Sequence, residues 1–109
     1  MITKKSIQDA YVLLRGLEPF KSWKLPSLIE ARVSDSLDEY GAFEEPNIII
    51  ISKARVYEFD QFLMTVAHEM VHLYQSRQKK MGDPPYHNAF FYEHAKQVCK
   101  EMGWRESGF

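Results

Sequence analysis

Two histidines and a glutamate at positions 68, 69 and 72 are the residues whose types and spacing indicate chemistry. If the surrounding segment is helical, His68 and His72 lie one turn apart on the same face, separated by about 6 Å along the axis at a rise of about 1.5 Å per residue. Two imidazoles placed in this way can bind one metal ion. Glu69 lies beside the first histidine, where its carboxylate can reach a metal-bound water without being a ligand itself.

The residues around this motif favour a metal site over a chance match on an exposed helix. Most of the helix circumference is apolar, as in a helix that is buried in a core; the apolar residues are Phe62, Leu63, Val66, Ala67, Met70, Val71 and Leu73. The polar residues form a narrow stripe of Thr65, His68, Glu69, His72 and Gln75. Burying such a stripe costs free energy unless its groups are paired or bound to a metal. We therefore interpret the H-E-x-x-H sequence as a zinc-binding motif.

A catalytic zinc site usually has three protein ligands and one water, so a third ligand is needed in addition to the two histidines. The candidates downstream are His87, Glu93 and His94. His87 and His94 are about two helical turns apart, so one ion cannot bind both. Position slightly favours His87, because it follows the stiff Asp83-Pro84-Pro85 loop at the start of the last helix. Glu93 would be the ligand in a gluzincin-like site, and otherwise Glu93 and His94 would lie on the helix surface or orient a ligand.

The motif predicts hydrolysis of an amide bond. Zinc would lower the pKa of its bound water, and Glu69 would accept the proton as the water attacks a carbonyl carbon. Glu69 would then pass this proton to the leaving amine, so one carboxylate acts first as base and then as acid. Three tyrosines are near enough in sequence to donate a hydrogen bond to the oxyanion, but nothing in the sequence chooses among Tyr74, Tyr86 and Tyr92.

The segment His68-Glu69-Met70-Val71-His72, followed by His87-Asn88-Ala89-Phe90-Phe91 and a helix ending near Met102-Gly103-Trp104, resembles the SprT-like family of zinc metalloproteases. The resemblance implies that the zinc ligands are His68, His72 and His87. It also implies that Glu69 is the catalytic residue and that Phe91 packs the last helix. Asn88 stands where the family often has glycine. We expect a compact form of the domain, without the zinc ribbon that follows it in many bacterial members.

Size and composition limit the remaining possibilities. A chain of 109 residues forms one domain with one modest core, so we treat residues 1–109 as a single metalloprotease domain. Its 14 Lys and Arg against 15 Asp and Glu give a net charge of −1, which does not support the association with nucleic acid that the resemblance implies. The lone Cys99 excludes an intramolecular disulfide. The sequence shows no signal peptide and no apolar run long enough to span a bilayer. We therefore expect a cytoplasmic protein that does not bind membranes, located in the host cytoplasm if the source is a virus. We also expect a monomer.

The periodicity of apolar residues predicts an α+β domain with an N-terminal helix, a small and mostly antiparallel sheet, the metal-binding helix and a C-terminal helix. The predicted helices span Ser6–Leu17, with Thr3 or Ser6 as N-cap, about Gln61–Lys80, with Asp60 as N-cap, and about Asn88–Met102. The predicted strands are Leu28–Asp35, Ala42–Glu44 and Ile48–Ile51, the last a central strand buried on both faces. Trp23 is expected to cover the core.

We expect a protein or peptide substrate, bound in extended form along an exposed edge of the small sheet. Two other functions fit the same zinc ligands. One is a zinc-binding interaction module without catalysis, although such a module has no need for Glu69. The other is a zinc amidase that acts on a non-protein amide such as a cell-wall peptide, although the chain has no export signal.

Overall fold

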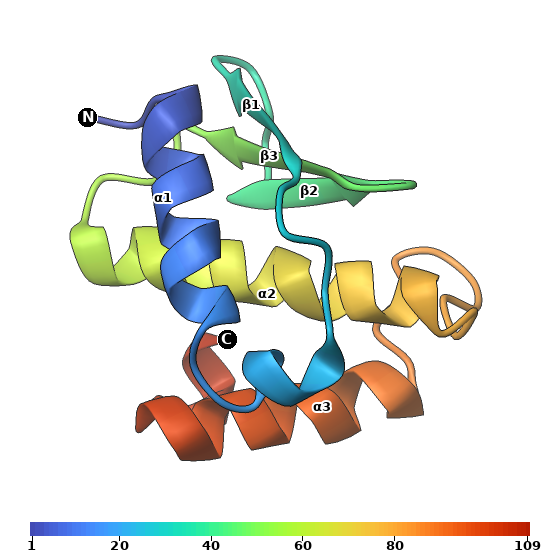
Figure 1. The fold of residues 1–109 in the computed structure, drawn as a ribbon. Helices are drawn as coiled ribbons and strands as arrows, with labels where there is room; N and C mark the ends of the chain where they lie inside the picture. Colours follow the sequence, from blue (N-terminus) through green and yellow to red (C-terminus); the bar gives the residue numbers. More distant parts are fainter.

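The computed structural model describes residues 1–109 and confirms the predicted α+β fold (Figure 1). One helix precedes a three-stranded sheet and two helices follow it, in the predicted order. The elements are α1 (Lys4–Arg15), a 3-10 helix η1 (Phe20–Trp23), β1 (Glu30–Ser34), β2 (Gly41–Glu44), β3 (Ile48–Ser52), α2 (Phe59–Arg77), α3 (Ala89–Met102) and a 3-10 helix η2 (Glu106–Gly108). None of these helices has the length and apolar character that a membrane crossing requires.

The sheet is mixed, with the strand order β1-β3-β2. β1 pairs with β3 in parallel, with Glu30 opposite Ile48, and β2 pairs with β3 antiparallel, with Gly41 opposite Ile51. We expected a mostly antiparallel sheet, and the structure has one pair of each kind. β3 is the central strand, as predicted. β2 is therefore an edge strand, and its outer edge faces the functional site described below.

The prediction that β3 is buried on both faces is wrong, because the helices cover only one face of the sheet. Ile49 and Ile51 point toward the helices and are fully buried, whereas Ile48 and Ile50 are half-buried on the other face. On that more open face, an ion-pair group spans the three strands, formed by Arg32 with Glu30 and Glu44.

α2 is the central element of the fold and lies between the sheet and α3 (Figure 1). Ten of its residues are buried, and the apolar ones belong to a core cluster of 21 residues that also draws on α1, η1, the sheet and α3. Trp23 of η1 is 9% exposed and stacks on Tyr74 of α2, so it covers the core as predicted. Because α2 packs on both sides, its orientation is fixed and so are the directions of its polar side chains.

The ends of the helices differ from the prediction by a few residues. α1 begins one residue after Thr3, whose side chain accepts a hydrogen bond from the backbone N–H of Ser6. α2 begins earlier than expected, so Asp60 is inside its first turn and is not the N-cap; Glu58 occupies that position without a side-chain cap. α2 also ends before Lys79, which has a φ of 58° in the left-handed region that cannot continue a helix.

Candidate metal centre and cavity

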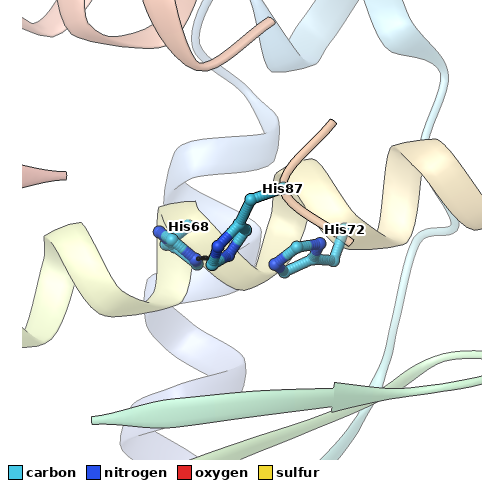
Figure 2. Close-up of side chains that lie close together, drawn as sticks. All are labelled: His68, His72 and His87. Atoms are coloured by element: carbon cyan, nitrogen blue, oxygen red, sulfur yellow. Dashed lines mark hydrogen bonds between the residues drawn. The ribbon is translucent and has the colours of Figure 1, made fainter. Parts of the chain in front are cut away.

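His68 and His72 lie one turn apart on the same face of α2, as the spacing predicts (Figure 2). His87 reaches the same place from the loop that joins α2 to α3. The ligand nitrogens of these three histidines all lie within 4.8 Å of one another, so the cluster could hold a metal ion. The aromatic ring of Phe91 packs against all three imidazoles, with centroid distances of 4.9 Å to His68 and 4.7 Å to each of the other two.

Hydrogen bonds to the two histidines of α2 fix which ring nitrogen carries the proton. Nδ1 of His68 donates to the backbone oxygen of Phe109 at 2.7 Å, and Nδ1 of His72 donates to Oε1 of Gln75 at 2.6 Å. Burial lowers the pKa of both histidines to about 4, so both are neutral at neutral pH. Their Nε2 atoms therefore carry a lone pair instead of a proton, which is the form that binds metal.

His87 completes the cluster, and the other two candidates for the third ligand lie outside it. Nε2 of His87 is 3.2 Å from Nε2 of His68. His94 instead packs against Trp23 and Tyr74, and its Nδ1 donates to the backbone carbonyl of Phe90 in its own helix at 2.7 Å. Glu93 is exposed on α3 and is not part of the cluster.

Glu69 is the one polar residue of the α2 stripe without a hydrogen-bond partner. Its side chain is only 5% exposed, and burial raises the pKa of this carboxyl to about 8, with a smaller contribution from the charge of Glu39. The other four residues of the stripe each donate to a partner: Thr65, His68, His72 and Gln75. Glu69 lines the same cavity as the three histidines. An unpaired buried carboxyl beside a metal-binding cluster is typical of a functional site.

The cavity that contains these groups has a volume of about 710 Å³. Its walls are β2 with the two residues before it, α2 as far as His72, the loop before α3 and the segment that ends at Phe109. No lysine or arginine lines the cavity, whereas four carboxyl side chains do, namely Glu39, Glu58, Asp60 and Glu69, and none of them forms an ion pair. Of the three tyrosines considered as oxyanion donors, only Tyr86 lines the cavity.

Two polar residues that support the cluster were missed by the sequence analysis in this role. Gln75 is fully buried and contacts His72, the backbone carbonyl of Tyr86 before His87 and the side chain of Asn88 after it. Asn88 accepts a hydrogen bond from the backbone N–H of Phe91 and so forms the N-cap of α3. The only sequence signal for Gln75 is its position three residues after His72, on the polar stripe of a buried helix.

Comparison with known proteins gives no indication of the family: no protein-family model, curated protein or solved structure matches the chain.

Proposed function

We propose that this protein is a zinc-dependent metallopeptidase with a SprT-like domain, with His68, His72 and His87 as zinc ligands and Glu69 as general base. One observation carries the proposal. Two neutral imidazoles whose Nε2 atoms carry no proton, a third histidine and an unpaired buried carboxyl all line one open cavity. A structural zinc site would not need an unpaired Glu69 or an open cavity beside the ligands.

The ligand set fits zinc. Imidazole is a common zinc ligand, and two nitrogens bound to one tetrahedral zinc ion lie about 3.3 Å apart. The 3.2 Å between Nε2 of His68 and Nε2 of His87 is close to this separation, whereas the three ligand nitrogens as a set lie within 4.8 Å of one another. Three protein ligands with an open cavity beside them match a catalytic site more closely than a structural one, which has four. Zinc bound there would supply a Lewis acid that lowers the pKa of water.

Glu69 would move the proton in this reaction. Burial raises its pKa to about 8, and a cation at the histidines would favour the ionised carboxylate, since opposite charges stabilise each other. The carboxylate would take a proton from the attacking water and then deliver it to the leaving amine. Because no group of the protein forms a hydrogen bond with Glu69, both carboxyl oxygens are available to the attacking water.

The edge of β2 is the proposed binding surface for the peptide. The backbone carbonyl of Tyr40 accepts a hydrogen bond from the N–H of Ser52, and antiparallel pairs alternate between bonded and non-bonded positions. The N–H and C=O groups of Gly41 and Phe43 therefore point away from β3, toward the free edge. A substrate strand that pairs with these groups would lie along the cavity that contains Glu69. The acidic lining would favour substrates with basic side chains.

The test is hydrolysis of a denatured, fluorescently labelled protein by zinc-loaded wild type and by Glu69→Gln. We expect wild type to release labelled peptides and Glu69→Gln to lose at least about two orders of magnitude in rate while binding the same amount of zinc. His68→Ala should lose both zinc and activity. A wild type that binds zinc but hydrolyses neither proteins nor peptides would contradict the proposal and favour a zinc-binding interaction module.

A further inference from the structure

We propose that Gln75 is a positioning residue that couples the second ligand of the cluster to the third. Its carboxamide lies between α2 and the loop that carries His87, and it contacts both. Oε1 accepts from Nδ1 of His72 at 2.6 Å, and Nε2 donates to the backbone carbonyl of Tyr86 at 2.9 Å and to Oδ1 of Asn88 at 3.1 Å. The inference rests on the proposed metal site and goes beyond it by giving a role to a residue that binds no metal.

The oxygen and the NH₂ group of the carboxamide contact different parts of the site. The oxygen fixes the tautomer of His72, so that its Nε2 faces the cluster. The NH₂ group holds the residues immediately before and after His87 in the sequence. A single fully buried side chain is therefore hydrogen-bonded both to one imidazole of the cluster and to the residues on either side of another. No other side chain bonds both to a histidine of the cluster and to the backbone that flanks another.

The loop needs such a restraint because its backbone is unfavourable. Tyr86 has a φ of 71°, in the left-handed region that a residue with a large side chain rarely adopts. Such a conformation persists only when surrounding contacts hold it. The hydrogen bond from Gln75 to the carbonyl of Tyr86 is one such contact, and it lies directly before His87.

Asn88 extends the same restraint to the start of the loop. Its Nδ2 donates to the carbonyl oxygens of Lys80 and Met81 at 3.0 Å each, while its Oδ1 accepts from Gln75 and from the N–H of Phe91. Gly82 makes room for this amide, since a Cβ at Gly82 would lie 2.8 Å from Nδ2 of Asn88. The loop is thus tied to α2 through Gln75 and to α3 through Asn88.

The experiment measures Zn²⁺ affinity by competition with a chromophoric chelator in wild type, Gln75→Met, His87→Ala and the double variant. Methionine has a similar volume and removes both hydrogen-bonding ends. We expect Gln75→Met to weaken zinc binding about 10- to 100-fold in the wild-type background. In the His87→Ala background we expect a clearly smaller loss, because the part of the effect that acts through His87 is already gone. The exposed Gln97→Met on α3 is the matched control and should bind zinc like wild type.

Amide hydrogen exchange of the metal-free protein gives a second readout that needs no zinc. Gln75→Met should raise exchange at Tyr86, His87 and Asn88 while leaving α1 unchanged. If Gln75→Met does not fold, Gln75→Glu replaces it, since it keeps an acceptor for His72 and loses the donor to the loop.

Wild-type zinc affinity together with wild-type loop exchange in the variant would overturn this inference alone. An equal loss of affinity with and without His87 would also overturn it. Wild type that binds no zinc would overturn the proposed function as well.

Discussion

Gly41 on β2 and Glu69 on α2 lie so close that no side chain fits between the strand and the helix: a Cβ added to Gly41 would be 3.3 Å from Oε2 of Glu69. The same Cβ would be 2.8 Å from Cγ2 of Thr65 and 3.0 Å from the carbonyl oxygen of Ile50. The glycine therefore allows the edge strand to lie directly along the helix at the proposed general base. This contact places the free edge of β2 beside the carboxyl group.

Gly41→Ala should lower both stability and peptide hydrolysis. The new methyl group must displace β2 or the side chains of Thr65 and Glu69, which we expect to cost about 1–3 kcal/mol of unfolding free energy. Thr65→Ser removes Cγ2 and keeps the hydroxyl that bonds to the carbonyl of Gln61, so it should reduce the cost of Gly41→Ala. Denaturant unfolding and kcat/KM on a peptide substrate measure the two effects.

Gly16→Ala is the control for this substitution. Gly16 has a φ of −81°, and a Cβ there would meet its nearest atom at 3.5 Å, which is an ordinary contact. We expect Gly16→Ala to leave activity unchanged and to be neutral or stabilising by up to about 1 kcal/mol. If both glycine variants behaved alike, the close approach of β2 to α2 would not explain the effect at position 41.

The acidic cavity should select substrates by charge. Of two peptides that differ only in a lysine or a glutamate near the scissile bond, the lysine peptide should have the higher kcat/KM. Glu39→Gln combined with Asp60→Asn should reduce this preference by about 1 kcal/mol, roughly a factor of five, and added salt should reduce it as well. Glu101→Gln, an exposed charge on α3, is the control. Equal kcat/KM for the two peptides in wild type would show that the lining charges do not contact the substrate.

Tyr11 should make the protein sensitive to alkaline pH. Its hydroxyl is fully buried and donates to the carbonyl of Pro26 at 2.5 Å, and burial raises its pKa from 10 to about 12. Between these values the folded state keeps a proton that the unfolded state loses, so stability falls as pH rises from 10 to 12. The loss due to Tyr11 is of the order of 2 kcal/mol. Tyr11→Phe should be less stable than wild type at pH 8, and the difference should shrink by pH 11.5 in denaturant unfolding. A difference that does not change with pH would contradict this.

The part of the site that lies on α2 could be predicted from sequence, because the geometry of a helix alone determines how its side chains are spaced. The period of an α-helix determines which side chains of α2 lie on the same face. The polar stripe through His68, Glu69 and His72 could therefore be predicted from the spacing of these residues in the sequence. His87 was harder, since its place depends on the loop. It was favoured over His94 by its position after the two prolines and by the resemblance to the SprT-like family.

The contacts that orient the ligands could not be predicted from sequence. The partner of His68 is a backbone oxygen 41 residues away, and every residue has a backbone oxygen. The role of Gln75 depends on where Tyr86 and Asn88 return to α2, which is a property of the whole loop. The half-exposed face of β3 was missed for a similar reason: four consecutive isoleucines do not reveal that helices cover only one side.

The most direct test of the account is the metal content of the purified protein, measured by elemental analysis on wild type, His87→Ala and His94→Ala. His94 is the matched control, because it is the other histidine considered as third ligand but lies within α3 and packs against Trp23 and Tyr74. We predict about one zinc ion per chain in wild type and in His94→Ala, and little or none in His87→Ala. No zinc in wild type, even after zinc is added, or equal zinc content in His87→Ala and wild type, would contradict the proposed metal centre.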